Sequence, residues 1–210
     1  MIIRPVCIAL GACALAGCGS FFESSIPAPQ SYVLRLPPPA EHEGVTQTKG
    51  SVKVLRPEPG PGLASEHIVL LRSDRRFDFY AATQWAAPAP DVMESVMIER
   101  LRGTGAFSAV LDDAAPYPPY YNLRCGLARF EADYTVSAPA PTVKVTLNCT
   151  FGRHRDRVLL ASFTAEGSAA ASADRLSAVV TAFETATGAA LTELERHVAG
   201  ALAAEHDAAG

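Results

Sequence analysis

The chain has 210 residues, a formal net charge of −4 and 49% hydrophobic residues. This length suits one domain of ordinary size, and the apolar content suffices for a sizeable core. Because the charge is mildly negative and the basic residues are scattered, the composition argues against a nucleic-acid-binding surface.

The first eighteen residues have the pattern of a bacterial lipoprotein signal. Arg4 supplies a positive charge, and the 13 residues 5–17 form an uncharged apolar run. This run is too short to span a bilayer, which takes about 20 residues, but it suits the hydrophobic region of a signal peptide. Ala16 and Gly17 then precede Cys18, so that Leu-Ala-Gly-Cys resembles the lipobox of bacterial lipoproteins.

Cys18 has two interpretations. Residues 1–17 are either a lipoprotein signal peptide, with Cys18 as the lipid-bearing first residue of the mature chain, or an ordinary secretory signal followed by a chance cysteine. We favour a covalent diacylglycerol and acyl lipid on Cys18, because the lipobox residue types fall in order. Two or more acyl chains hold a protein stably on a membrane. Gly19 is not the aspartate that usually retains such proteins at the inner membrane, so the resemblance implies the periplasmic face of the outer membrane.

The segment after Cys18 separates the leader from the domain. Residues 18–30 carry two prolines and no helical or strand period, so we expect a flexible tether there. Residues 31–36 are a short strand candidate that stops at three consecutive prolines. We expect one domain over residues 31–204 and a short C-terminal tail over residues 205–210.

The first part of the domain has the pattern of short strands. Residues 51–56 alternate weakly, which indicates a strand, and the proline-rich residues 57–62 are expected to be a loop. The β-rich runs 67–72 and 77–80 flank four polar residues, which is the pattern of a hairpin. The first of these runs is apolar throughout, so we expect it in the interior of its sheet.

A helix is predicted after Trp85. Pro88 and Pro90 end the preceding strand, and Asp91 suits a helix cap or first turn. The apolar residues expected toward one side of this helix are Val92, Val96, Ile98 and Leu101. The glycines of Gly103-Thr-Gly105 provide the stop, because glycine adopts the left-handed cap. Residues 107–111 then return as a strand, and residues 112–119 form a loop.

The clearest β feature is a long hairpin with strands at residues 121–134 and 143–151. Apolar and polar residues alternate in both strands, so one face of the hairpin is expected to be buried and the other exposed. Cys125 and Cys149 are each 12 residues from Ser137 in the turn, which places them opposite one another on the apolar face. In an oxidising periplasm they are either a cross-strand disulfide or two small buried hydrophobic side chains.

The chain ends in a further strand, expected at residues 158–167, and a long helix at residues 173–204. The helix has apolar residues at helical spacing, namely Leu176, Val180, Phe183, Leu191, Leu194, Val198 and Leu202, and the charged residues Glu184, Glu193, Glu195 and Arg196 lie mostly off that stripe. We favour packing of this helix on its own sheet over a coiled coil, and Gly188 marks a bend or a close contact. The fold class is α/β bordering on α+β: a single domain with a mixed, largely antiparallel sheet and two main helices packed on it.

No catalytic or metal-binding motif emerges from the sequence. The histidines, at positions 42, 67, 154, 197 and 206, are scattered and lack zinc-site spacing. No serine lies in a Gly-x-Ser-x-Gly elbow, and Gly103-x-Gly105 lacks the third glycine of a phosphate-binding loop. We interpret the pair Asp112 and Asp113 as a turn former in a proline-rich loop. We therefore expect no enzymatic activity, no metal and no cofactor other than the lipid on Cys18.

Taken in order, these motifs resemble the ABC-type transport auxiliary lipoproteins, the family that includes the PqiC-like intermembrane transport lipoproteins. The resemblance covers residues 32–202 and is carried by Tyr32–Leu34, Ile68–Arg72, Phe77–Tyr80, Trp85 with its downstream prolines, the helix of Val92–Leu101, the Phe107 strand and the terminal helix. The alanine-rich run after Trp85 and residues 51–56 depart from the family pattern.

The resemblance implies a mixed sheet with two helices and a non-enzymatic role beside an MCE-domain protein, a permease and an ATPase that move lipids between the membranes. The lipoprotein would dock the periplasmic MCE assembly at the outer membrane, with a ring-forming homo-oligomer as one arrangement and no nucleic-acid partner. The alternative is an envelope lipoprotein that scaffolds or activates a cell-wall or envelope-assembly enzyme. Tyr80 and Trp85 are candidate interface residues because aromatic side chains often anchor interfaces; Trp85 is otherwise a buried structural residue.

Overall fold

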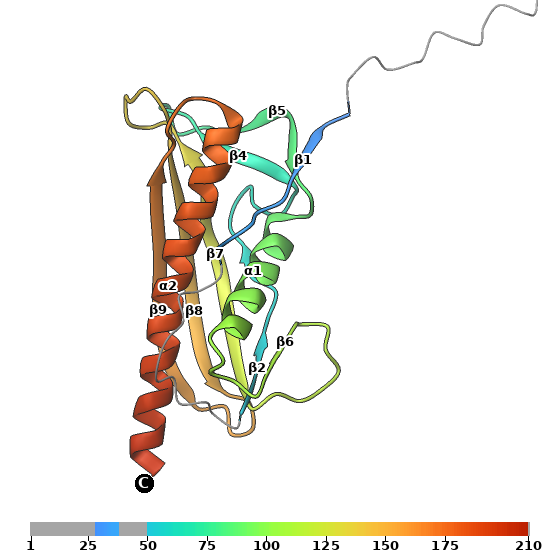
Figure 1. Cartoon of the computed structure of the whole chain (residues 1–210), viewed down its shortest axis with the longest axis vertical. Helices are drawn as coiled ribbons and strands as arrows, with labels where there is room; N and C mark the ends of the chain where they lie inside the picture. The colour runs from blue at the N-terminus through green and yellow to red at the C-terminus, as the bar shows by residue number, and fades with distance from the viewer. Residues whose placement is uncertain (1–27, 38–49, 210) are drawn as a thin grey trace, which may run out of the picture.

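The computed structural model describes residues 28–37 and 50–209 (Figure 1). The expected signal peptide (residues 1–17), Cys18 and most of the expected tether lie outside these ranges, as does His42. The described residues form a single domain, an open mixed sheet of nine strands with two helices. This confirms the predicted fold class.

The elements follow one another along the described chain. They are β1 (Gln30–Tyr32), β2 (Ser51–Val54), β3 (Glu58–Pro59), β4 (His67–Leu71), β5 (Phe77–Trp85), α1 (Ala89–Gly103), β6 (Ala109–Leu111), β7 (Tyr121–Asp133), β8 (Thr142–Arg153), β9 (Leu159–Ala170) and α2 (Leu176–Ala209).

The sheet is built around β7, its longest strand. One edge of β7 pairs antiparallel with β8, which pairs antiparallel with β9. The other edge pairs in turn with β2, β3 and β4, all parallel to β7. Beyond these, β6 lies parallel to β2, while β5 and β1 continue the sheet from β4. The predicted hairpins β4–β5 and β7–β8 are confirmed, and β4 lies inside the sheet as expected.

Both helices cover the same face of the sheet (Figure 1). The long helix α2 packs along β8 and β9, as the sequence predicted, and α1 lies beside it over β2, β3 and β6. On the β7–β9 meander, the other face carries polar residues such as Thr146, Asn148 and Thr164, and neither helix of the described chain covers it. The domain therefore has two layers, with one sheet face exposed.

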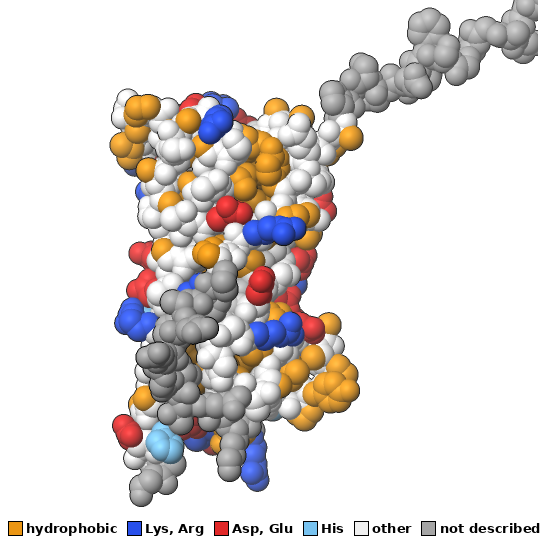
Figure 2. Space-filling view, in the orientation of Figure 1, with side chains coloured by type: hydrophobic (Ala, Val, Ile, Leu, Met, Phe, Trp, Pro, Cys, Tyr) orange, Lys and Arg blue, Asp and Glu red, His pale blue; other side chains and the backbone are white. Residues whose placement is uncertain are grey.

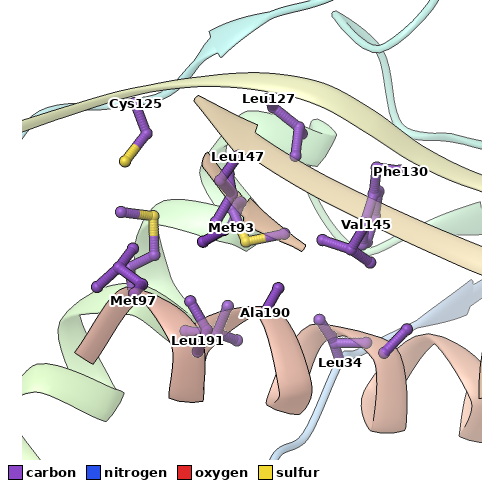
Figure 3. Close-up of a cluster of buried hydrophobic side chains, with 14 of the residues drawn as sticks. Leu34, Met93, Met97, Cys125, Leu127, Phe130, Val145, Leu147, Ala190 and Leu191 are labelled. Carbon is purple, nitrogen blue, oxygen red and sulfur yellow. The ribbon is translucent and has the colours of Figure 1, made fainter. Parts of the chain in front are cut away.

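The core lies between the sheet and the helices. Figure 3 shows Met93 and Met97 of α1 and Leu191 of α2 close to Leu127 and Leu147 of the two central strands. None of these five side chains is more than 1% exposed. Fully burying a side chain of this size contributes about 1.5–3 kcal/mol, so this layer supplies much of the stability.

Helix α1 begins at Ala89 with Pro90 in its first turn, and Gly105 with a φ of 66° ends it as predicted. Of the predicted apolar side, Val96, Ile98 and Leu101 are buried as expected, whereas Val92 is only half-buried. Met93 and Met97 are buried as well and point to the core. The flexible methionines fill the irregular space between α1, α2 and the sheet, which a count of branched apolar residues does not anticipate.

Helix α2 begins at Leu176 instead of residue 173 and continues to Ala209. At its start, the Asp174 side chain accepts a hydrogen bond from the Tyr134 hydroxyl (2.6 Å), which holds this residue in the preceding loop. At its end, residues 205–209 are helical, although we expected a tail there. The Glu205 carboxylate accepts hydrogen bonds from Tyr121 and Arg153, both at 2.8 Å, and this fixes the last turns on the sheet.

Glu195 corrects the predicted stripe of α2, because it is only 8% exposed. Both of its carboxylate oxygens accept from Arg100 of α1, at 2.6 and 3.1 Å. A bidentate arginine–carboxylate pair satisfies both charged groups, so their burial between the helices is stable. The pair ties α1 to α2.

Close contact between α2 and the sheet is made at Gly167 of β9 and not at Gly188. A Cβ added at Gly167 would lie 1.8 Å from the carbonyl oxygen of Ala186. A Cβ at Gly188 would meet nothing within 4 Å among the residues described. The helix backbone thus rests directly on β9, and only glycine fits beneath it.

The strand predicted at residues 31–36 is confined to the start of that range, in β1. After Tyr32 the chain turns Leu34 into the core, where it is 5% exposed. The backbone N–H of Arg35 donates to the Glu184 carboxylate (3.2 Å) instead of to a neighbouring strand. This tertiary contact with α2 is why the strand stops.

Candidate functional site

Cys125 and Cys149 lie opposite one another in the β7–β8 ladder, in the register that the sequence predicted. The structure contains a disulfide between them, with an S–S distance of 2.06 Å. Both cysteines are buried, and Cys125 points toward the helices (Figure 3). A cross-link that closes a loop of this length contributes about 3 kcal/mol in the chain-entropy model. Because the sulfurs are inaccessible, this bridge is structural.

Trp85 is a core residue. Of its two interpretations, the buried structural residue is therefore the correct one, and the interface residue is not. Its side chain is 0% exposed. The indole packs against Phe130 and Phe183, with ring centroids 5.3 and 5.1 Å away. β5 ends at Trp85 and turns toward α1 there, so the ring is carried under α2 and no partner can reach it.

Tyr80 is half-buried and links three segments. Its hydroxyl lies 2.9 Å from that of Tyr134, which donates in turn to Asp174 ahead of α2. Burial, together with the hydrogen bond to Tyr134, raises the pKa of Tyr80 far above its usual range. The Tyr80 hydroxyl is therefore neutral at all ordinary pH values. Through its hydrogen bond with Tyr134 it links β5 to the end of β7 and to the start of α2.

An open cleft of about 770 Å³ lies between α1, Arg56 and the loop after β6. Asp112 and Asp113 line it, and both build the loop: the Asp112 carbonyl accepts from Ala115, and the Asp113 N–H donates to Glu94 (3.0 Å). Ser95 donates its hydroxyl proton to a carbonyl of its own helix. The cleft lining holds no histidine or cysteine.

Three of the four described histidines take part in packing or hydrogen bonding. His67 packs against Phe79, His197 stacks on Phe163, and His154 lies 3.0 Å from the Asn122 amide. Within residues 28–37 and 50–209, no cluster of three or more histidine, cysteine or carboxylate side chains is placed to hold a metal ion. Functional contacts must therefore be sought on the surface.

The large apolar side chains exposed on the surface gather toward the two ends of the described domain. The proximal end is where β1 begins, and it carries the β4–β5 hairpin and the β7–β8 turn; the distal end carries the β6–β7 loop, the β8–β9 turn and the end of α2 (Figure 1). We name Phe77, Phe79 and Val136 the proximal patch, and Tyr117, Tyr120, Val158 and Leu159 the distal patch. Val33 is also exposed but lies further inward, directly after the residue that pairs with Trp85. Figure 2 shows apolar side chains gathered over the β6–β7 loop.

The distal patch is supported by the core. The backbone N–H of Tyr120 donates to the Ser51 carbonyl (3.1 Å), and its carbonyl accepts from the His154 N–H (2.8 Å). Its ring packs edge-on against Tyr121, whose ring stacks on Phe151, with centroids 4.7 and 5.1 Å apart. The β6–β7 loop and the β8–β9 turn are thereby held together, and their exposed aromatic residues rest on a rigid base.

Charged residues surround the distal patch. Arg153 is held by Asp156 and Glu205, both at 2.8 Å. The hydrogen bonds that Arg153 donates to Asp156 and to Glu205 raise the pKa of its guanidinium, which stays charged. Arg155 and Arg157 are exposed on the same turn. Exposed tyrosines with an arginine rim have the composition that is enriched at protein–protein interfaces.

The proximal end has a cluster of four charged side chains on the sheet face that points away from the helices. Glu131 and Asp133, each 4% exposed, are neutralised by Arg129 and Lys144. Burial opposes ionisation of Asp133, but hydrogen bonds from Lys144 and Thr135 outweigh it and hold the pKa of this carboxyl well below its usual range. These charges are satisfied internally, which leaves the nearby Phe77 and Phe79 as the exposed apolar groups of β5.

A protein-family model, described as ABC-type transport auxiliary lipoprotein component, matches residues 32–196. The chain belongs to this family. The match begins at the last residue of β1 and ends in α2, so it includes both patches and the whole sheet except Gln30 and Ser31. Neither helix of the described auxiliary lipoprotein is long and apolar enough to cross a membrane.

Solved structures share the fold of this auxiliary lipoprotein. The crystal structure of a Xanthomonas campestris protein of the family DUF330 is 24% identical, with a TM-score of 0.70 over 85% of this chain and 97% of that one. A second crystal structure, titled only as an uncharacterized protein, is 13% identical, with a TM-score of 0.61 over 81% and 97% of the two chains. A comparison with curated proteins finds no significant match.

Sequence reasoning missed both patches. It placed interface candidates at Tyr80 and Trp85, which face inward, and it treated Tyr117 as a loop residue and left Tyr120 unassigned. The available signal was the aromatic content of the β6–β7 loop, which has two tyrosines among three prolines. In β5 the only signal was the pair Phe77 and Phe79 on one side of a strand, and period alone does not say which side is buried.

Proposed function

We propose that this auxiliary lipoprotein is anchored through a lipid on Cys18 to the periplasmic face of the outer membrane, where it docks an MCE-type ABC lipid transport system. Its direct partner is the periplasmic MCE-domain protein, and the chain itself is not an enzyme. The observation that carries the proposal is the Leu-Ala-Gly-Cys18 lipobox ahead of a family match over residues 32–196. ATP hydrolysis and lipid movement then belong to other subunits.

Two lengths support an orientation for the anchored domain. Gln30 follows Cys18 by 12 residues, which span at most about 40 Å when fully extended. The 12 residues of β8 run between the proximal and distal ends and also measure about 40 Å. The distal end thus reaches the membrane only with the tether stretched to its limit. We infer that the proximal end faces the membrane and the distal end faces the periplasm.

The distal patch is then the surface available to the MCE-domain protein. Tyr117 and Tyr120 are 68% and 52% exposed, on a loop that is held by Ser51 and His154. Rigid aromatic side chains lose little conformational entropy on binding and often provide the anchoring contacts of an interface. The arginines of the β8–β9 turn supply a polar rim.

The anchor is tested by metabolic labelling with a palmitate analogue and by membrane fractionation. The wild-type protein is expected to carry the label and to fractionate with the outer membrane, whereas Cys18→Ser is expected to lose the label and appear in the soluble periplasm. Equal labelling of both forms would contradict the anchor, and inner-membrane localisation of the labelled wild type would contradict the outer-membrane location.

Docking is tested with a photo-crosslinking amino acid at Tyr117 or Tyr120 in the lipidated protein in cells. The matched control carries the crosslinker at Thr164, which is exposed on the polar sheet face. Crosslinks to an MCE-domain protein are expected only from the distal positions. The double variant Tyr117→Ala/Tyr120→Ala is expected to lose about 2 kcal/mol of binding, or roughly 30-fold in affinity. Crosslinks to a cell-wall synthase instead would overturn the transport role.

A further inference from the structure

The proximal patch has a defined face on the β4–β5 hairpin. Phe77 and Phe79 are two residues apart on β5, so their side chains lie on the same side of the strand. Their partners in the ladder are Leu71 and Val69 of β4. Tyr80, on the other side of β5, reaches Tyr134 and Asp174 at the helix-covered face. The two phenylalanines therefore lie on the sheet face away from the helices.

These phenylalanines are incompletely buried by their own chain. Phe77 is 49% exposed and Phe79 is 41% exposed, and Phe79 packs against the ring of His67 at 4.5 Å. Completing the burial of each ring would be favourable, because removing apolar surface from water stabilises a contact. The pair is thus an apolar contact site that the domain leaves open.

A basic turn stands next to the two rings. Residues 72–76 contain Arg72, Arg75 and Arg76, and the nearby carboxylates are Asp74 and Asp78. Arg72 pairs with Asp78 (2.7 Å) and Arg76 with Asp74 (2.5 Å). The Arg75 side chain is exposed and forms no ion pair with the part of the chain that the structure describes. With three arginines against two aspartates, the turn presents a positive charge beside the apolar surface.

The patch is close to the point where the chain leaves toward Cys18. Gln30 of β1 pairs with Thr83 of β5, and Phe79 precedes Thr83 by four residues, or about 13 Å of strand. The Cys18–Gln30 link spans at most about 40 Å. Of the two patches, the proximal one is therefore held nearest to any bilayer that carries the lipid.

We propose that Phe77 and Phe79, together with Arg75 and its neighbouring arginines, contact the phospholipid surface of the leaflet that holds the anchor. Apolar rings enter the boundary between headgroups and acyl chains, while arginines meet the phosphates, which is the pattern of interfacial membrane contacts. This contact fixes the orientation of the domain and keeps the distal patch turned toward the periplasm. The inference rests on the lipid anchor of the proposed function but does not depend on the identity of the docking partner.

The test uses tryptophan fluorescence in the mature, lipidated protein. The chain has one tryptophan, Trp85, which is 0% exposed and gives a constant background. Phe77→Trp and Phe79→Trp place a second tryptophan in the proximal patch, and Tyr117→Trp is the matched control in the distal patch. Each protein is reconstituted on vesicles of phosphatidylethanolamine and phosphatidylglycerol, with or without brominated acyl chains as quenchers. Flotation of the vesicles shows that the protein is anchored.

Quenching by the brominated lipid is expected at positions 77 and 79, where emission from the added tryptophan should fall by about twofold or more. Tyr117→Trp should keep its emission. Replacing phosphatidylglycerol with phosphatidylcholine should weaken the quenching, because the arginines lose their anionic partners. Equal quenching at all three positions, or none at 77 and 79 in floated protein, overturns the membrane contact and leaves the anchor intact. Protein that does not float overturns the anchor and this inference together.

Hydrogen exchange is measured on the lipidated protein without substitutions, so that its result does not depend on whether a tryptophan variant folds correctly. The amides of residues 77–81 and 72–76 are expected to exchange more slowly on vesicles than in detergent, while those of residues 153–159, in the β8–β9 turn of the distal end, stay unchanged. Protection confined to residues 153–159 would mean that the distal end faces the membrane, and it would overturn the proposal. Protection at the proximal patch that appears only when an MCE-domain protein is added would assign this surface to a protein partner and would overturn it as well.

Discussion

The proximal and distal ends of this auxiliary lipoprotein use the same strands but expose different chemistry. At the distal end, loops carry tyrosines that rest on the rings of Tyr121 and Phe151. At the proximal end, a strand carries phenylalanines beside an arginine-rich turn and a cluster of four paired charges. The long axis therefore separates a surface suited to a protein partner from one suited to a lipid surface, and the shared middle of the domain holds them apart.

A substitution in the middle of the domain, where α2 packs on β9, is expected to cause the largest loss of stability. Gly167→Ala places a Cβ 1.8 Å from the Ala186 carbonyl oxygen, so α2 must move off β9. A loss of about 3 kcal/mol is expected, and it should weaken both ends, because α2 runs between them. Urea denaturation measures it. The control Gly188→Ala, whose Cβ meets no described atom within 4 Å, should stabilise the helix by up to about 1 kcal/mol.

Removal of the Cys125–Cys149 disulfide is expected to cause the second-largest loss of stability. The double variant Cys125→Ala/Cys149→Ala is expected to lose about 3 kcal/mol or slightly less, because the unfolded chain is no longer constrained by the closed loop. Dithiothreitol should lower the stability of the wild type by a similar amount and leave the variant unchanged. If free-thiol labelling of the oxidised mature protein modified Cys125 or Cys149, the bridge itself would be contradicted.

The charge cluster makes the proximal end sensitive to acid. Because the pKa of Asp133 is held below its unfolded value, its contribution to stability is present above about pH 4 and is lost as the pH falls further. Asp133→Asn should lower stability at neutral pH by about 2 kcal/mol, since charged hydrogen bonds with Lys144 and Thr135 are lost. Stability should also fall less steeply with acid in Asp133→Asn than in the wild type. Parallel pH profiles for the two proteins would show that another group governs the acid response.

The smallest effect is expected at the distal end. Glu205→Gln weakens the contacts with Arg153 and Tyr121 that hold the last turns of α2, and about 1 kcal/mol should be lost. Faster hydrogen exchange is expected in the last turns alone, with little change at the proximal end. Asp207→Asn, an exposed change two residues later, is the control and should have no effect. Changes that spread to residues 77–85 would mean that the two ends are coupled more strongly than the contacts suggest.

Local pattern predicted the β7–β8 hairpin and its register. Counting 12 residues on each side of Ser137 paired Cys125 with Cys149, although β7 contains an extra residue near Ala128. The count was right because the loop beyond the bulge is centred between Ser137 and Ala138, and the extra residue compensates for that offset. Alternation over two long strands was strong enough to fix which face is buried.

The local sequence pattern could not predict contacts between elements that are far apart in the chain. Glu195 is charged, and only its pairing with Arg100 of another helix explains why it is buried. Gly167 lies in a strand, and its need for glycine comes from the backbone of α2 above it. The exposure of Phe77 and Tyr117 depends on what neighbouring elements leave uncovered. Membrane attachment, by contrast, is predicted from the leader, which lies outside the described residues.

The three-residue strand β1 has a mechanical consequence. Under the proposed anchoring, it is the first element to bear a pull on the lipid. The strand runs inward from the proximal end beside Thr83–Trp85, so tension at Gln30 acts along its axis and loads all of its backbone pairs together (Figure 1). Behind them Leu34, which is 5% exposed, must leave the core before the chain can unravel. Tension between the two membranes would therefore act as a shear force on the backbone pairs between β1 and β5. The domain would transmit this force without changing its length.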